Sequence, residues 1–331
     1  MVRLDMVQGI KADMHTWYWE ATDKVYKKLN RYYDKMVEVL PLSTITGGYW
    51  KGTSAIGATQ LEDRINYGKL YEDKPQEGFQ VYACIKQKGL KVKVPSEVER
   101  DWHRTQSFLK DYVKTNWPEA VETTKEKIVA NLYNYGGYTS GHSVFNNNDS
   151  DIGLTTYTSP DLCYDGAPFF NLANNLRTAK NGSTYYNAVA LAGITFANAK
   201  TMYNLLTATN NKKENGNPFD NSQDLIVVTN TANKLDWDAI NNSTLNPDNA
   251  QNATNTLKGA FKDIIANPYL TTATFSAIQR RSMGIKFFVS EPKFNFWEEN
   301  DAPTMWASVV YDYAICVQNF RPIVSNNAPI A

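Results

Sequence analysis

The dominant pattern in this chain is a stretch, 96–135, in which apolar residues recur every three or four positions. Such spacing predicts an amphipathic helix, and at about 1.5 Å per residue one unbroken helix would be about 60 Å long. Gly136 and Gly137 are placed to end it. Because Pro118 lies inside the stretch, we expect a kink there or a split after Asn116.

The first third of the chain is predicted to contain a helix, a loop and a hairpin. A helical pattern covers 10–40 and is expected to end at Pro41. Residues 43–57 are small and Gly-rich, which predicts a loop. In 79–94, apolar and polar residues alternate on both sides of 87–89, which predicts a two-stranded hairpin. Lysines along both strands would discourage unwanted edge pairing.

The rest of the chain alternates polar loops with shorter elements. Residues 138–190, rich in Asn, Gly, Ser, Thr and Tyr, are predicted to form long loops with short strands. Helices are predicted at 194–208 and 230–240, and strands at 225–228, 260–266, 272–279, 285–289, 294–296 and 309–317. Strict alternation in the last strands indicates long antiparallel pairs. We therefore expect an α+β fold, with no visible repeat or independent linker.

The charge balance argues against a dedicated nucleic-acid binder. Lys plus Arg and Asp plus Glu each number 34, so the formal net charge is zero, whereas neutralising phosphates requires a basic excess. Cys84, Cys163 and Cys316 are odd in number and follow no CxxC spacing, which is typical of reduced thiols. The sequence shows no signal segment and no run near the ~20 apolar residues that span a bilayer. We expect a soluble, intracellular protein.

No pattern in the sequence predicts an active site. The three histidines, His15, His103 and His142, have no metal-ligand partner at a suitable spacing. Motifs for phosphate binding, serine hydrolysis and zinc proteolysis are absent. Residues 146–153 superficially resemble a calcium loop but lack the spacing and closing Glu of an EF-hand. We expect no catalytic residue, cofactor or metal ion, although a Cys163–His142 pair in a cytoplasmic hydrolase stays open as an alternative.

Four short stretches resemble a known family when taken in order. They are 165–171 (DGAPFFN), 216–218 (GNP), 267–271 (NPYLT) and 297–322, which contains YDY near its centre. With the order of helix, loop, hairpin, long helix, irregular segment and return strands, they are similar to the Mu-like branch of the Hong Kong 97-type major capsid proteins of tailed phages. That family often has a His soon after the first stretch, where this chain has Asn-Leu-Ala-Asn at 171–174.

The resemblance implies the parts of that fold. They would be an N-terminal helix or arm (1–56), an extended loop or E-loop (57–94), a peripheral domain with a long spine helix (95–145 and 283–325), an axial domain (146–282) and a C-terminal tail (326–331). The E-loop would lie on the peripheral domain of a neighbouring subunit.

The resemblance also implies a structural protein that is not an enzyme. Its copies would form the pentamers and hexamers of an icosahedral shell, with scaffold, portal and decoration proteins as further partners. It would be assembled in the cytoplasm of a bacterial host, belong to the virion and contact no membrane. The neutral charge suggests that double-stranded DNA is enclosed without strong binding. Some members cross-link a Lys to an Asn, but no motif assigns such a pair to Lys69 or Lys74.

Two other functions stay open at this point. An encapsulin-type compartment, which encloses enzymes, would share the fold, although the Asn- and Thr-rich loops favour a virion. A tail or surface adhesion protein would belong to a different class, and the long helix from Ser96 onward disagrees with it.

Overall fold

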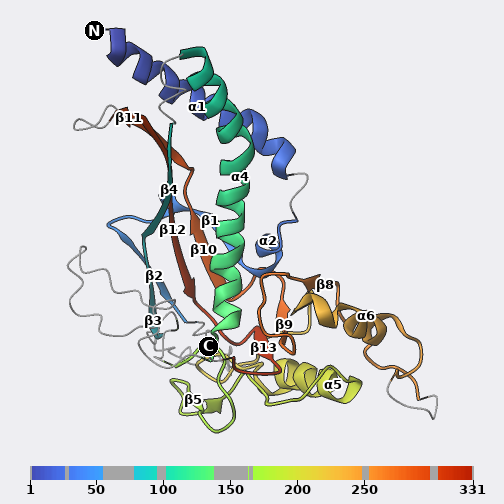
Figure 1. Ribbon diagram of the computed structural model, residues 1–331. Helices are drawn as coiled ribbons and strands as arrows, with labels where there is room; N and C mark the ends of the chain where they lie inside the picture. The colour runs from blue at the N-terminus through green and yellow to red at the C-terminus, as the bar shows by residue number, and fades with distance from the viewer. Residues whose placement is uncertain are drawn as a thin grey trace, which may run out of the picture.

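The structure is a computed structural model that describes residues 2–26, 30–54, 78–94, 102–137, 163, 167–247, 253–298 and 305–329. Within these ranges the strands form two larger sheets and two small two-stranded ones. Figure 1 shows the first larger sheet in the upper part of the molecule and the second at its lower right. A long helix runs down beside the first sheet and ends close to the second.

The first sheet is built around its longest strand. Its members are β1 (Glu38–Pro41), β4 (Lys86–Lys93), β10 (Ile285–Val289), β11 (Lys293–Glu298) and β12 (Met305–Val317). Strands β10 and β11 pair antiparallel with successive parts of β12 along one edge, and β4 pairs antiparallel along the other. Strand β1 adds in parallel to β10. Strand β12 is therefore hydrogen-bonded on both sides, and from Ala307 onward all of its residues except Val310 are buried.

Helices α1 (Val2–Tyr26) and α4 (Trp102–Asn134) pack against each other on the first sheet. Helix α1 also contacts β11. It buries the stripe that the sequence indicated, which consists of Ile10, Met14, Trp17 and Ala21. Trp117 of α4 stacks on Phe294 of β11, with ring planes 7° apart. The buried stripe of α1 is therefore part of the main core of its own chain.

The second sheet has its own helices and a second core. Its strands are β7 (Leu225–Thr229), β8 (Asp263–Ala266), β9 (Ser276–Arg280) and β13 (Ile323–Ser325), in the order β13-β9-β7-β8. Its helices are α5 (Phe196–Asn204), which continues as the π-helical turn η3 (Leu205–Thr209), and α6 (Lys234–Asn242), which follows the 3-10 turn η4 (Thr231–Asn233). Strand β7 alternates between two cores: Ile226 joins the main core, and Val227 joins the core with α5 and α6.

Short elements complete the described structure. Strand β2 (Tyr49–Thr53) pairs with β3 (Gln80–Cys84), and β5 (Arg177–Thr178) pairs with β6 (Thr184–Tyr185). Helix α2 (Tyr33–Met36) precedes β1, and the 3-10 turn η1 (Leu42–Thr44) follows it. Residues of β2 and β3 cover the face of the first sheet that lies opposite α4, in a small core with Phe288 and Cys316.

The helix predicted over 10–40 is wrong from residue 30 onward. Helix α1 is described up to Tyr26, residues 30–32 are not helical, α2 is one separate turn, and 38–41 form strand β1. Helical periodicity cannot reveal that β10 offers a free edge to this segment, and the backbone hydrogen bonds gained there decide its conformation. Pro41, which has no N–H to donate, fits at the end of an outermost strand.

The hairpin predicted over 79–94 is also wrong. Strands β3 and β4 occupy this stretch but pair with β2 and β12, not with each other. Residues 87–89, predicted as the turn, lie inside β4, and the predicted loop 43–57 contains β2. Alternation finds strands but not their partners, and β12 provides a longer apolar partner than β3 could. Residues 55–77 lie outside the described ranges.

The long helix is confirmed over Trp102–Asn134 and is not split at Pro118. Figure 1 shows α4 bending in its upper part, as a proline without an amide proton would allow. The residues between Ser96 and Asp101 lie outside the described ranges. The predicted end at the glycine pair is confirmed, because α4 ends at Asn134 and the turn that follows it, 135–137, contains both glycines.

The remaining predicted elements that fall on described residues are confirmed within a few positions. These are the helices near 194–208 and 230–240 and the strands near 225–228, 260–266, 272–279, 285–289, 294–296 and 309–317. From residue 167 onward, the irregular stretch contains only the short strands β5 and β6 up to residue 190, as expected.

We predict that Gly137→Ala destabilises the subunit by about 1–3 kcal/mol, because a methyl group there would overlap the backbone of Ala328. The N–H of Gly137 also donates to the carbonyl of Pro329 at 2.8 Å, so the backbone cannot easily move away. Urea unfolding measures the change. Gly9→Ala in α1 is the control: its Cβ meets nothing within 4 Å, so it should be neutral or stabilising by up to about 1 kcal/mol. Equal stability of both variants would contradict the prediction.

Candidate functional site: an anchor for the N-terminal segment

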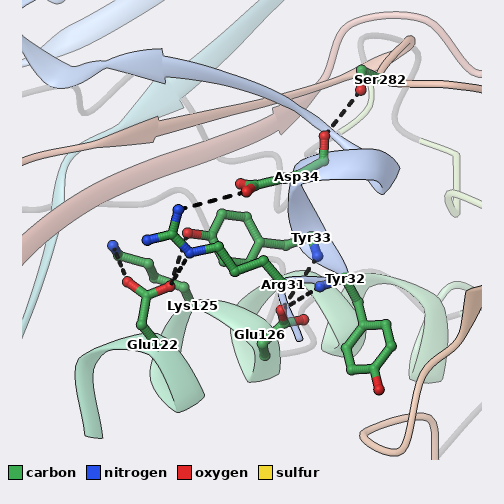
Figure 2. Close-up of polar contacts among 8 residues, drawn as sticks. All are labelled: Arg31, Tyr32, Tyr33, Asp34, Glu122, Lys125, Glu126 and Ser282. Carbon is green, nitrogen blue, oxygen red and sulfur yellow. Dashed lines mark hydrogen bonds and ion pairs between the residues drawn. The ribbon is translucent and has the colours of Figure 1, made fainter. Parts of the chain in front are cut away.

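A cluster of charged and polar residues joins the segment around α2 to the middle of α4 (Figure 2). This anchor cluster consists of Arg31, Tyr32, Tyr33, Asp34, Glu122, Lys125, Glu126 and Ser282. Lys125 and Glu126 follow Glu122 by three and four positions, so all three lie on one side of α4. That face is buried by the N-terminal segment rather than exposed to solvent.

Glu122 is the centre of the cluster. The residue is 2% exposed. Its carboxylate pairs with Lys125 Nζ at 2.7 Å and with Arg31 Nε at 3.2 Å. The Tyr33 hydroxyl donates to the same carboxylate at 3.1 Å. Lys125 in turn lies 5.5 Å from the ring centroid of Tyr311 on β12. Each buried charge therefore has a partner, and this offsets the cost of removing it from water.

Glu126 holds the start of α2 through backbone contacts. Its Oε1 accepts the N–H of Tyr32 at 2.7 Å and the N–H of Tyr33 at 3.4 Å. The pKa of Glu126 is raised to about 7, mainly by burial and also by the nearby carboxylates of Glu122 and Asp34, while the two amides act in the opposite direction. Burial also raises the pKa of Asp34 and of the Tyr33 hydroxyl. Near neutral pH, a substantial fraction of Glu126 therefore carries a proton.

The segment that is held on α4 also contacts the second sheet and its neighbouring turn. Lys35 Nζ pairs with Asp263 on β8 at 2.6 Å, and the Gln279 side chain on β9 donates to the carbonyl of Met36 at 2.7 Å. The backbone N–H of Ser282 donates to the carbonyl of Lys35 at 3.1 Å. Residues 30–36 therefore connect α4, the first sheet and the second sheet at one point.

The chemistry of this arrangement is structural. Its carboxylates bind backbone amides, a phenol and cations of the same chain, so the described contacts position backbone and hold elements together. Sequence reasoning missed the cluster because it placed 10–40 in one helix, in which Arg31 lies off the apolar stripe. The available signal was the group of three charged residues, Glu122, Lys125 and Glu126, at helical spacing among the apolar positions of α4.

Of the two residues of the hydrolase alternative, only Cys163 lies in the described ranges, so the Cys163–His142 pair stays an untested prediction. Cys163 is buried, bridges to Val317 of β12 and has Arg177 Nη2 at 4.0 Å. His142 lies outside the described residues, as do the calcium-like stretch 146–153 and both Lys69 and Lys74. His15 accepts a hydrogen bond from Trp19 on α1 at 3.1 Å.

Within the described ranges, no group of three or more His, Cys, Asp or Glu is arranged to hold a metal ion. None of the helices described combines the length and apolar character that a membrane crossing requires.

Solved structures share the fold over nearly the full length of the chain. A virus-like particle protein from Pyrococcus furiosus is 10% identical, with 97% of this chain and 99% of that chain covered and a TM-score of 0.50. A structure from Mycobacterium phage Patience is 12% identical, with 98% and 88% covered, at a TM-score of 0.50. The capsid of a native GTA particle is 8% identical, with 88% and 87% covered, at 0.50.

These similarities confirm the α+β, Hong Kong 97-type fold that the sequence predicted. At such low identity they show the fold alone, and they do not confirm the Mu-like branch. No protein-family model matches the chain, and no curated protein matches it by sequence.

Glu122→Ala should destabilise the subunit by about 3–5 kcal/mol, because it leaves the largely buried Lys125 without its carboxylate partner. The matched control is Glu20→Ala. Glu20 pairs with Lys114 at a similar 2.6 Å, but its side chain is 55% exposed, so its loss should cost only about 0–1 kcal/mol. Urea unfolding of both variants at pH 7 tests the difference. Similar small losses would mean that the cluster does not anchor the segment.

Glu126→Gln should change how stability depends on pH. Because the pKa of Glu126 is about 7 in the folded chain against an ordinary 4.5, the folded state binds this proton more tightly. The resulting stabilisation is fully present below about pH 4.5 and is lost as the pH rises through about 7. The glutamine variant keeps an acceptor without the charge, so relative to the wild type it should gain at most about 3 kcal/mol between pH 5 and pH 8.

Unfolding in urea at several pH values measures this gain. Glu119→Gln, on an exposed position of the same helix, serves as the control and should leave the wild-type pH profile unchanged. A Glu126→Gln variant that loses stability relative to the wild type as the pH rises would contradict the assignment.

Proposed function

We propose that this chain is the major capsid protein of a tailed double-stranded DNA phage, a subunit that self-assembles into an icosahedral head. The observation that supports this most is the extent of the structural match. Both this chain and a phage or virus-like particle chain are covered almost end to end. The described residues add no separate catalytic domain to the shared fold. This is expected of a protein that functions through contacts between subunits. We infer that it is not an enzyme.

The expected division of the chain is part of the proposal. The first sheet with α4 would be the peripheral domain (95–145 and 283–325), and the second sheet with α5 and α6 would be the axial domain (146–282). The arm (1–56), the E-loop (57–94) and the tail (326–331) would complete it. Two contacts refine these limits: β1 pairs with β10 in the first sheet, and β13 pairs with β9 in the second.

The partners of the proposed subunit are first of all its own copies, in pentamers and hexamers. A closed symmetric shell multiplies contacts that are modest one by one. Scaffold, portal and decoration proteins would assist in the host cytoplasm, and the mature location would be the virion. The formal net charge of zero is consistent with DNA that is enclosed without strong binding. The comparisons do not favour the encapsulin-type alternative.

Expression of the full chain, with and without a scaffold protein, should give closed particles. Size-exclusion chromatography and negative-stain electron microscopy would detect them. Monomers under every condition would contradict the proposed function, and particles that package only enzymes would favour the compartment.

A deletion tests whether the E-loop serves assembly. Thr53 and Gln80 are paired neighbours on β2 and β3, and the N–H of Ser54 donates to the carbonyl of Phe79 at 2.8 Å. Residues 57–77 can therefore be replaced by a short Gly-Ser linker without separating these strands. The shortened subunit should unfold at an unchanged urea midpoint but form no particles. Loss of folding would show that the segment belongs to the core.

A further inference from the structure

A groove runs along α4, between the helix and strand β4 at the edge of the first sheet. It consists of two adjoining cavities of about 580 and 250 Å³, which share Lys88, Ile128 and Asn131 in their walls. Leu90 and Val309 continue the wall on the side of the sheet. The groove therefore follows about three turns of α4, from Ala120 to Leu132.

The floor of the groove is apolar and part of it is accessible. Leu90 is 44% exposed, although it pairs with the buried Val309 on the face of the sheet that α4 covers. Among the described strands β4 pairs with β12 alone, along one of its two edges. An edge strand beside an apolar groove is a common peptide-binding arrangement.

The rim of the groove is basic. Lys86 and Lys88 lie on the sheet side, and Lys127 is an exposed residue on the helix side. The residues that line the two cavities include no Asp and no Glu. Lys91 and Lys93 alternate with this set and therefore lie on the opposite face of β4. There Lys91 lies 4.5 Å from the ring centroid of Trp306.

This charge pattern limits what can bind. Two copies that paired through their β4 edges would set lysine against lysine, which is unfavourable. The occupant must bring carboxylates for the rim and apolar side chains for the floor. Residues 138–166 of this chain have such a composition: four aspartates, no lysine or arginine, and apolar residues that include Ile152 and Leu154.

We propose that this groove binds the aspartate-rich stretch of a second copy of the chain, with Asp149 and Asp151 against Lys88 and Lys127. The inference rests on the proposed shell function, in which neighbouring copies meet at high effective concentration. It adds an inter-subunit contact of defined charge to that function.

Charge reversal in the full chain tests the contact. The groove variant Lys88→Glu/Lys127→Glu and the segment variant Asp149→Lys/Asp151→Lys should each raise the critical concentration for particle formation at least tenfold. Their urea midpoints as dissociated subunits should stay unchanged. A chain that carries all four substitutions should assemble again within about threefold of the wild type. An equimolar mixture of the two double variants should also recover in part, since each kind of copy supplies one intact half of the contact.

The control is Lys91→Glu/Lys93→Glu, the same charge change on the opposite face of β4, which should assemble normally. The proposal is overturned if the control fails as the groove variant does, if the groove variant assembles normally, or if the four substitutions together give no rescue. Rescue of the groove variant by Glu72→Lys/Asp73→Lys would identify a different segment as the occupant, and this result would also overturn the proposal. A loss of urea stability in the separate subunits would indicate binding within one copy, again against the proposal. If the wild type itself forms no particles, the proposed function fails before this contact is tested.

Discussion

The rest of the structure depends on strand β12 being paired along both edges and covered on both faces. Strand β4 pairs along one edge and β10 and β11 along the other. Tyr311 and Ile315 face the main core with α4, while Ala314 and Cys316 face the smaller core with β2 and β3. A strand enclosed in this way gathers segments from every third of the sequence. It therefore provides the fixed frame on which α1, α4 and the N-terminal segment pack.

The anchor cluster places a second constraint on this frame. The segment around α2 adds Tyr33 and Met36 to the apolar main core. It is also held by charge, because Glu122 binds two cations and Glu126 binds two backbone amides. Charged contacts depend on protonation and geometry more than apolar packing does. The same segment reaches the second sheet through Lys35 and Gln279. The stability of this junction between the two sheets is thus expected to depend on pH through Glu126.

The proposed groove between α4 and β4 follows from the way α4 packs on the sheet around β12. Because α4 covers the apolar face of the first sheet only in part, the β4 side keeps an open groove with a basic rim. A subunit of a closed shell needs such incomplete surfaces, since its neighbours complete them. The lysines of β4, which we first interpreted as protection of an exposed hairpin, also give this surface a preference for acidic partners.

The sequence by itself determined the elements whose signal is local. Three local patterns predict the elements that carry them: the periodicity of α4, the alternation in β10 to β12, and the glycine pair after the long helix. In each case the residues that form the pattern also make the contacts of that element. The order of these elements was enough to suggest the fold. Only the tertiary structure decided which strands pair. Strand β4 pairs with β12 across more than 200 residues of sequence. Residues 38–41, which were predicted as helix, form a strand that pairs in parallel with β10. The anchor cluster was hidden for the same reason: its charges become buried only when distant segments meet, and burial is what gives them partners and shifted pKa values.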